Sequence, residues 1–306
     1  MVQGAQGHIE DPRNDKVLVY VNGELVPRDK ATVSAFDAGF VLGDGVWEAM
    51  RVINGRLFDL DKHIDRLFKG ARAIDMDIGR SREELIAEIR RTLDANGMKH
   101  GAHIRVMVTR GVKATPNQDP RYTIGKATIV MAAEYKQPNP EMRQRGLRLF
   151  TSTMRCSPPD MFDMQLNTHS RLNLIMALNQ ALKAGADEAL MLDPHGFVSS
   201  CNSTNFFIVT SGEVWTSTGA YAFKGITRGN VIDVGRTAGI AVLEKNFTLA
   251  DVYSADEAFV TGTFGGLTPV SMVDGHAIGD TDRPLIDRLR GLYEAMQAKQ
   301  CPAQLD

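Results

Sequence analysis

A proline-rich break, Gln137-Pro138-Asn139-Pro140, separates two halves of this chain that carry different hydrophobic patterns. Proline fixes its own φ, lacks an N–H donor and disfavours a helical residue before it, so this stretch favours a linker. Strand and helix patterns alternate before the break, and short strands predominate after it. We therefore predict an α+β fold with a flexible N-terminus, a smaller domain, a linker and a larger domain, at residues 1–15, 16–136, 137–145 and 146–306 respectively.

Turn and capping residues give the clearest local signals. Asp61 is the predicted N-cap of a helix that continues to residue 73, and Ser81-Arg-Glu-Glu84 has the capping-box pattern. Gly185 predicts the end of a helix over residues 170–184. A further helix is predicted over residues 228–238, and strands are predicted over residues 17–21, 104–108, 127–132, 147–152, 188–192, 205–209, 214–215 and 258–261.

The composition argues against several classes of protein. A net charge of -2 supplies no electrostatic footprint for nucleic acid or for an anionic membrane. No apolar run approaches the ~18–20 residues of a membrane-spanning helix, and the first residues lack the pattern of a signal peptide. The three cysteines, Cys156, Cys201 and Cys301, stand at no metal-ligand spacing. Their odd number favours a reducing cytoplasm over a disulfide framework.

A candidate anion site precedes the helix predicted over residues 228–238. Gly225-Ile226-Thr227 stands directly before that helix. A helix N-terminus presents N–H groups without intrahelical partners and the positive end of the helix dipole, which together suit a phosphate. Thr227 adds a hydroxyl. Taken alone, the same residues are equally typical of an ordinary helix start.

A series of motifs stands along the chain in the order and at the spacing found in one known family of proteins. The series comprises Tyr20-Val-Asn-Gly23, Gly43-Asp-Gly-Val-Trp-Glu-Ala-Met-Arg51, Phe58-Asp-Leu-Asp-Lys-His63-Ile-Asp-Arg66, Ala184-Gly-Ala-Asp-Glu-Ala-Leu-Met-Leu-Asp193, Gly225-Ile-Thr-Arg228, Ala255-Asp-Glu-Ala-Phe-Val-Thr-Gly-Thr263 and Thr268-Pro-Val270. From Val17 to Leu289 the chain thereby resembles the class IV aminotransferases, the fold-type IV group of pyridoxal-phosphate (PLP) enzymes. The resemblance implies a small α/β domain and a larger pseudo-barrel domain with PLP between them. It also implies amino acids and 2-oxo acids as substrates, and a homodimer whose sites include loops of both subunits.

The resemblance also implies which residues hold the cofactor phosphate. These are Gly225, Ile226 and Thr227, the arginine of the His-x-x-Arg segment, Arg66, and the turn Gly262-Thr263. A guanidinium fork suits phosphate oxygens.

Two arginines are candidates for binding a substrate carboxylate. Arg105 stands where branched-chain members of the family carry an arginine, and Arg110 stands where D-amino-acid members carry theirs. Each is also compatible with an ordinary surface position. The presence of both leaves the subclass open and suggests an anionic substrate such as a dicarboxylate.

The chain departs from the family at the residue that carries the chemistry. In most members the lysine that forms the Schiff base with PLP stands eighteen residues before the glycine of a Gly-x-x-Glu-Ala segment. That glycine is Gly185 here, so Asn167 stands at the lysine position. The amide nitrogen of asparagine is delocalised into its carbonyl and is neither a nucleophile nor a base. Ordinary transamination is therefore not expected.

A second departure concerns the pyridine ring of the cofactor. Ser200 and Cys201 replace the glutamate and glycine of the family's Ser-Glu-Gly motif. The family glutamate raises the pKa of the ring nitrogen, whereas a serine hydroxyl supplies no charge, so the ring becomes a poorer electron sink. Cys201 is a candidate nucleophile or an inert buried thiol.

His169 and Arg171, which follow Asn167, are the candidate replacements in catalysis. His169 has an unperturbed pKa near neutrality, which suits an acid or a base, although a buried hydrogen-bonded histidine would explain it equally well. Three hypotheses follow. The protein binds PLP or pyridoxamine phosphate (PMP) non-covalently and acts on amino acids and 2-oxo acids; or it is a PLP-independent enzyme that uses the old pocket for a small anion; or it is a non-catalytic binding homologue.

Overall fold

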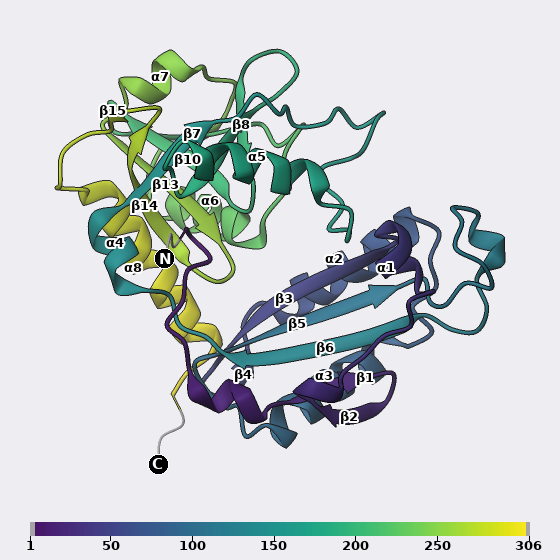
Figure 1. Cartoon of the computed structure of the whole chain (residues 1–306). Coiled ribbons are helices and arrows are strands. Elements are labelled where there is room, and N and C mark those ends of the chain that lie inside the picture. Colours follow the sequence, from purple (N-terminus) through teal and green to yellow (C-terminus); the bar gives the residue numbers. More distant parts are fainter. Residues whose placement is uncertain (1–3, 304–306) are drawn as a thin grey trace. The chain divides into compact units, whose positions relative to one another are not determined.

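The computed structural model describes residues 4–303, which form two compact units (Figure 1). The smaller unit contains Glu10–Gln137, Leu166–Arg171 and residues 301–303, and the larger unit contains residues 4–9, Pro138–Gln165 and Leu172–Gln300. The short segment Leu166–Arg171 therefore returns to the smaller unit from within a stretch of sequence that otherwise builds the larger one.

An antiparallel sheet forms the base of the smaller unit, with the strand order β2-β1-β6-β5-β3-β4. Its strands are β1 (Leu18–Val21), β2 (Glu24–Pro27), β3 (Gly45–Ile53), β4 (Arg56–Leu57), β5 (Ala102–Thr109) and β6 (Thr128–Tyr135). Its α-helices are α1 (Ala38–Leu42), α2 (Leu60–Ala73) and α3 (Arg82–Ala95), and its short 3-10 helices are η1 (Pro12–Lys16), η2 (Arg28–Lys30) and η3 (Pro120–Tyr122).

The helices α2 and α3 cover one face of this sheet (Figure 1). Side chains alternate across a strand, so every second residue of β3, including Val46 and Met50, enters the core with Ile104 of β5 and Ile64 of α2. The side chain of Glu48 lies on the same core-facing side of β3, although it is charged. The intervening residues of β3 and β5 point to the opposite face of the sheet.

A second, mixed sheet organises the larger unit, with the strand order β12-β11-β10-β13-β14-β7-β8-β9 and β15 beside β14. Its strands are β7 (Leu147–Thr151), β8 (Glu188–Leu192), β9 (Val198–Cys201), β10 (Asn205–Thr210), β11 (Glu213–Thr216), β12 (Val242–Glu244), β13 (Glu257–Gly262), β14 (Gly266–Val273) and β15 (His276–Ala277). Its α-helices are α4 (Pro140–Arg145), α5 (Leu172–Lys183), α6 (Ile226–Thr237), α7 (Leu249–Tyr253) and α8 (Pro284–Gln300).

Alternation along β10 and β13 places one face of the sheet of the larger unit against α8. Phe207 and Phe259 stack on one face with ring centroids 4.7 Å apart. Glu257, with the same alternation as Phe259, accepts hydrogen bonds from the first backbone N–H groups of α8. Residues of β13 that share this alternation, Thr261 among them, therefore lie on the helix side of the sheet.

The segment expected to be a linker has regular structure. Pro140–Arg145 forms α4, because Asn139 caps the helix by accepting from the N–H of Glu141 and because proline is tolerated in the first turn of a helix. The two units divide between Gln137 and Pro138, at the break that the sequence indicates.

Three helix starts, those of α2, α5 and α6, and the N-terminal segment also differ from the sequence-based expectation; α6 begins at Ile226, two residues before the predicted start. Asp59, not Asp61, is the N-cap residue of α2, and α5 begins at Leu172 because the preceding residues pair with β3. The N-terminal residues that the structure describes pack on the larger unit, where Ala5 is buried and His8 forms a β-bridge with Pro138. They are held there by backbone pairing and burial.

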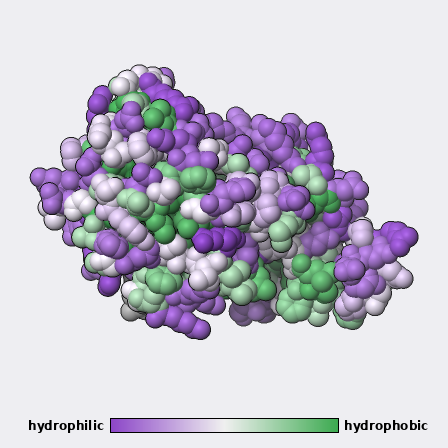
Figure 2. Space-filling view, turned by 90° about the horizontal axis from the view of Figure 1, so that it is seen from above, coloured by the Kyte–Doolittle hydropathy of each residue, from purple (hydrophilic) through white to green (hydrophobic). Residues whose placement is uncertain are grey.

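The face shown in Figure 2 is mainly hydrophilic, with hydrophobic groups distributed among the hydrophilic ones. Between residues 4 and 303, no helix has the length and apolar character that crossing a membrane requires. Several exposed hydrophobic side chains lie on α5, where Leu172, Ile175, Met176 and Leu182 are all at least two-fifths accessible to solvent, and others lie between residues 33 and 42.

Candidate functional site

Backbone pairing fixes the position of Asn167 in the smaller unit. The backbone oxygen of Asn167 accepts from the N–H of Trp47 at 2.9 Å, and the N–H of His169 donates to the oxygen of Gly45 at 3.0 Å. Thr168 forms a β-bridge with Val46 between these two hydrogen bonds. The segment thus continues the sheet along the start of β3, and its side chains are placed by strand geometry.

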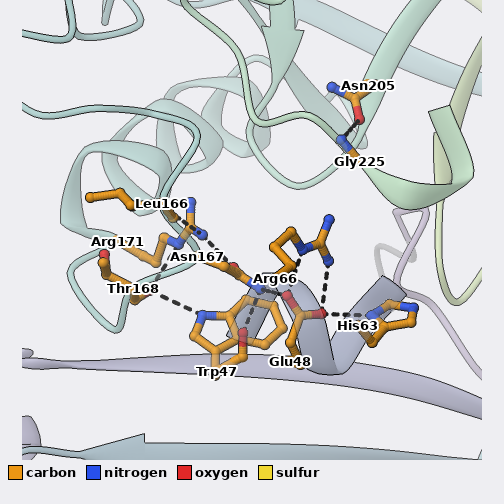
Figure 3. Close-up of polar contacts among 10 residues, drawn as sticks. All are labelled: Trp47, Glu48, His63, Arg66, Leu166, Asn167, Thr168, Arg171, Asn205 and Gly225. Carbon is orange, nitrogen blue, oxygen red and sulfur yellow. Dashed lines mark hydrogen bonds and ion pairs between the residues drawn. The ribbon is translucent and has the colours of Figure 1, made fainter. Parts of the chain in front are cut away.

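Both ends of the Asn167 side-chain amide are hydrogen-bonded (Figure 3). Its Nδ2 donates to the backbone oxygen of Trp47 at 2.6 Å and to Oε1 of Glu48 at 3.4 Å. Its Oδ1 accepts from Nη2 of Arg171 at 2.5 Å. The side chain is buried, so these contacts hold a neutral amide in a fixed position.

Glu48 is the buried charge at the centre of this cluster (Figure 3). Arg66 donates to it through Nε and Nη2, at 2.5 and 2.7 Å, and Nδ1 of His63 lies 2.6 Å from its Oε2. Burial alone raises the pKa of the Glu48 carboxyl, but Arg66 and His63 outweigh burial and lower this pKa below its ordinary value. Glu48 is therefore an ionised carboxylate that fixes the Arg66 guanidinium.

The burial of Glu48 and its pairing with Arg66 were not predicted from the sequence. A usable signal was present, because Glu48 has the same alternation along the strand as the core residues Val46 and Met50. A charged residue at such a position requires a buried partner. Arg66, predicted as a phosphate ligand, is that partner.

The two arginines predicted to bind a substrate carboxylate have different surroundings. Arg105 is exposed on the face of the sheet opposite α2, and its guanidinium carbon lies 4.2 Å from the centre of the Trp47 ring. Arg110 donates to both carboxylate oxygens of Asp44, at 2.6 and 3.1 Å, and to the backbone oxygens of Ile74 and Asp75. These contacts give Arg110 a structural role in joining the end of β5 to the end of α2.

His169 lies half-buried beside β3. Burial, followed by the nearby Arg105 guanidinium, lowers the pKa of the His169 ring. Its Nε2 is buried, and among the described residues it has no hydrogen-bond partner. The ring is therefore neutral near pH 7.

The N-terminus of α6 in the larger unit is built around Gly225. Its N–H donates to Oδ1 of Asn205 at 3.2 Å, and Nδ2 of Asn205 donates to the oxygen of Phe223 at 2.6 Å. A Cβ at residue 225 would lie 2.3 Å from the Asn205 oxygen, so the approach requires glycine. The helix has no side-chain cap, and Thr227 is buried in its first turn.

Thr261 carries an unpartnered hydroxyl on the same face of the sheet. It stands opposite Asn205 in the register of β10 and β13, with 1% of its surface exposed. Its Oγ1 has no hydrogen-bond partner within residues 4–303. The turn Gly262-Thr263 follows directly. A buried hydroxyl without a hydrogen-bond partner costs free energy unless a ligand supplies that partner. The residue opposite Thr261 is Asn205, which hydrogen-bonds the Gly225 N–H at the start of α6.

Ser200 and Cys201 lie buried on β9 in the larger unit. The Ser200 hydroxyl is a neutral group, and its proton is donated to the backbone oxygen of Thr204 at 2.9 Å. Burial, and next the nearby Glu188 carboxyl, raise the pKa of the Cys201 thiol well above its ordinary value. Cys201 is therefore a thiol and not a thiolate.

The residues described above can be compared with the chemical groups of a pyridoxal cofactor: its phosphate, its aldehyde and its ring nitrogen. The uncapped N-terminus of α6 and the orphan hydroxyl of Thr261 fit a phosphate ester. Asn167 does not fit a covalent bond to the cofactor aldehyde, and Ser200 does not supply the negative charge that a protonated ring nitrogen needs. The residues therefore fit the group as a non-covalent ligand.

Comparison with known proteins places the chain in a family. The model of the family described as Amino-transferase class IV matches residues 45–273, and the chain belongs to this family. It is 40% identical to a putative branched-chain-amino-acid aminotransferase of Methanocaldococcus jannaschii, over 86% of this chain and 90% of that protein. It is 39% identical to branched-chain-amino-acid aminotransferase-like protein 1 of Arabidopsis thaliana, over 93% of this chain and 51% of that protein. The chain thus spans about half the length of this plant relative.

Solved structures agree with the family assignment. The chain superposes on a T.th. branched-chain amino acid aminotransferase with pyridoxamine 5'-phosphate, with a TM-score of 0.85 and 29% identity, covering 94% of this chain and 96% of that one. The branched-chain aminotransferase of Thermoproteus uzoniensis with norvaline gives a TM-score of 0.83 at 29% identity, covering 93% and 95% of the two chains. The predicted fold-type IV fold is confirmed.

Proposed function

We propose that this protein binds PLP or PMP without a covalent bond and acts slowly on amino acids and 2-oxo acids. The observation that carries the proposal is the Asn167 amide, hydrogen-bonded at both ends at the family's lysine position, in a chain that retains an uncapped α6 N-terminus. The first feature removes the covalent link, and the second retains a site for the phosphate.

The cofactor phosphate would be held mainly by the larger unit. The first N–H groups of α6, the hydroxyls of Thr227 and Thr261 and the turn Gly262-Thr263 are the proposed donors. Arg66, fixed by Glu48, would add a guanidinium. When bound, the cofactor supplies the carbonyl or amino group that exchanges with the substrate, and a ring that accepts electrons.

Substrate positioning and proton transfer are assigned to the smaller unit. Arg105 is the proposed carboxylate ligand, whereas the guanidinium N–H groups of Arg110 already donate to Asp44 and to two backbone oxygens. His169, neutral and with an unpartnered Nε2 among the described residues, is the proposed proton acceptor in place of the lysine. Since general acid–base catalysis contributes about 10²–10⁴-fold, we expect a rate lower than that of lysine-bearing relatives by a factor in that range.

A binding experiment tests the cofactor role. The purified protein is titrated with PMP, PLP and phosphate-free pyridoxamine, and the PLP sample is treated with borohydride and analysed by mass spectrometry. We expect saturable binding of PMP and PLP, much weaker binding of pyridoxamine, and no mass increment on any lysine. A lysine-linked increment would contradict the non-covalent mode, and absence of saturable binding would remove the cofactor from the proposal.

We also propose that the protein is a homodimer in a reducing compartment. Leu172, Ile175 and Met176 expose an apolar stripe on α5, with Leu172 69% accessible, and such a stripe favours burial against another surface. The cysteines at 156, 201 and 301 are all buried free thiols, which supports a cytoplasmic location. Sedimentation of the wild-type protein against an Ile175→Glu variant tests the interface, and a monomeric wild type would overturn it.

A further inference from the structure

A cavity of about 460 Å³ lies within the larger unit at the C-terminal end of α5. It is lined by residues of β7 and β14, by the turns that follow α5 and β14, and by Tyr253 of α7; these elements are labelled in Figure 1. Ligand pockets in proteins commonly have volumes of about 300–1,000 Å³. The residues proposed to hold the cofactor phosphate lie outside this lining, so the cavity is a separate place on the molecule.

The lining includes a fixed carboxylate, that of Asp274 in the turn after β14. Its Oδ1 accepts from the N–H of Thr151 at 2.6 Å, and its Oδ2 accepts from the hydroxyls of Thr151 and Tyr253 at 2.5 and 2.9 Å. Burial and the hydrogen bond to Asp274 raise the pKa of Tyr253 to about 12, so this hydroxyl is a neutral donor. All three donors are neutral, and between residues 4 and 303 no cationic side chain forms an ion pair with Asp274.

The end of α5 adds negative potential to the same cavity. Ala184 and Gly185, which follow the last residue of the helix, belong to its lining. The last carbonyl groups of a helix lack intrahelical partners and carry the negative end of the helix dipole, which favours a cation. The Asp274 carboxylate and this helix end therefore both suit a positively charged group.

Arg148, on β7, brings a positive charge to the lining. Its backbone is fixed by Asp187, whose Oδ2 accepts from the Arg148 N–H at 2.8 Å. Within the part of the chain that the structure describes, its guanidinium forms no ion pair. Arg148 stands opposite Met272 in the register of β7 and β14, two residues before Asp274, which corresponds to ~7 Å along the strands. A small zwitterion with one hydrogen bond at each end spans a distance of this order.

The remaining lining supplies apolar surface next to the guanidinium. Phe150 lies on the same side of β7 as Arg148, because alternate residues of a strand share a face, and it packs against the cluster that contains Ala177 and Ala181 of α5. Phe150 and Met272 are both half-buried, so each presents part of its surface to the cavity.

We propose that this cavity is a second ligand site, which binds an α-amino acid with an apolar side chain. Arg148 binds its carboxylate, Asp274 and the C-terminal end of α5 bind its ammonium group, and Phe150 and Met272 contact its side chain. A guanidinium fork matches a carboxylate, and hydrogen bonds between charged groups are stronger than those between neutral ones. The cofactor takes no part in this site, so binding does not depend on it.

The methyl group of Met272 supplies a local reporter for the test. The protein, with its 14 methionines labelled in their methyl groups with carbon-13, is studied by NMR, and the Met272 signal is assigned with the Met272→Leu variant. The labelled protein is titrated with L-leucine, with 4-methylpentanoate, which lacks the ammonium group, and with 3-methylbutylamine, which lacks the carboxylate. We expect a saturable shift of the Met272 signal, with leucine bound at least about 10-fold tighter than either analogue.

Variants separate the two charged partners from general charge effects. Arg148→Met and Asp274→Asn should each weaken leucine binding about 10-fold or more. Asparagine tolerates the left-handed backbone of residue 274, where φ is 51°, and Arg148→Met changes an exposed residue, so it tests the site even if Asp274→Asn perturbs its turn. Arg155→Met, which changes an exposed arginine of the larger unit outside the cavity, is the matched control and should leave leucine affinity unchanged.

Three results would overturn the inference: no saturable shift of the Met272 signal, equal affinities for leucine and either analogue, and unchanged leucine binding in both Arg148→Met and Asp274→Asn. Met161, which is 78% exposed and lies outside the cavity, reports non-specific contact, and its signal should not shift. Leucine bound only at the proposed substrate site would be weakened by Arg105→Met instead of Arg148→Met, which also counts against the inference. Failure of the proposed function is a separate result, because it would appear as absent PMP binding.

Discussion

Nη2 of Arg171 donates to Oδ1 of Asn167 at 2.5 Å, so the Asn167 amide is tied to a cation four residues further along the chain. The opposite end of the same amide donates to the backbone oxygen of Trp47 at 2.6 Å. An amide with both ends used is well suited to a fixed structural position. The Asn167 side chain is therefore held from both sides, by the backbone of β3 and by Arg171.

Restoring the amine at this position should restore covalent binding of the cofactor. In Asn167→Lys, burial and the neighbouring Arg171 would lower the lysine pKa, whereas the Glu48 carboxylate, 3.4 Å from the present amide nitrogen, would raise it; the deprotonated fraction of the amine is the nucleophile. We expect PLP to become fixed to residue 167 by borohydride, as measured by peptide mass spectrometry. Asn167→Gln is the control and should show no adduct; an unmodified residue 167 in the lysine variant would contradict the assignment of this position.

Glu48→Gln should destabilise the protein by about 3 kcal/mol, because it leaves the Arg66 guanidinium beside a neutral group in a buried site. Urea denaturation measures the change. Asp65→Asn provides the comparison, since its ion pair with Arg82 is about half exposed and should contribute under about 1 kcal/mol. Equal effects of the two substitutions would show that Glu48 does not stabilise this unit.

Thr261→Val should separate ligand binding from folding. The Thr261 hydroxyl has no partner among the described residues, so its removal should leave stability unchanged or slightly raised. If the hydroxyl binds phosphate, PMP affinity should fall about 5- to 10-fold, as measured by calorimetry. In the matched variant Thr216→Val, a hydroxyl that donates to Phe206 is lost, so stability should fall by about 1 kcal/mol with PMP affinity retained.

His103 should make stability depend on pH below neutrality. Burial, and then the positive charges of Lys136, Arg105 and Arg51, lower the pKa of this histidine to about 3 in the folded protein. Between pH values of about 6.5 and about 3, the unfolded chain binds a proton at His103 that the folded protein does not. The free energy of unfolding is therefore not reduced by His103 above about pH 6.5, and it falls as the pH falls below that value.

The loss attributable to His103 at pH 5 should be about 2 kcal/mol, at about 1.4 kcal/mol per pH unit. Urea denaturation at pH 7.5 and pH 5 measures it, and His103→Gln should reduce the difference by that amount. His195→Gln, which changes an exposed histidine of the larger unit, is the control. A wild-type pH dependence in His103→Gln would contradict the prediction.

The cysteines should be unreactive in the folded protein. Burial raises the pKa of the Cys156 thiol to about 11 and that of Cys201 well above its ordinary value. We expect a thiol reagent at pH 7.5 to label Cys201 only after urea unfolding, as followed by mass spectrometry. Rapid labelling of Cys201 in the native protein would instead revive its role as a nucleophile.

Local signals in the sequence predicted much of the fold. Capping and turn residues located the helices, for example at Ser81, whose capping box with Glu84 is present, and at Gly185, which follows the end of α5. The helix predicted over residues 228–238 is present, but it begins two residues earlier than predicted, at Ile226. Non-local pairing was not predictable in this way, so the return of Leu166–Arg171 to the smaller unit was missed.

The sequence by itself determined the family and the residue types at 167 and 200, because motif order and residue identity need no three-dimensional information. Only the tertiary structure decided what surrounds them. The pairing of residues 166–171 with β3 brings Asn167 to Glu48, and the packing of α2 on the sheet brings Arg66 to the same carboxylate. Buried charge requires partners, and those partners are set by strand register and helix packing between segments far apart in the chain.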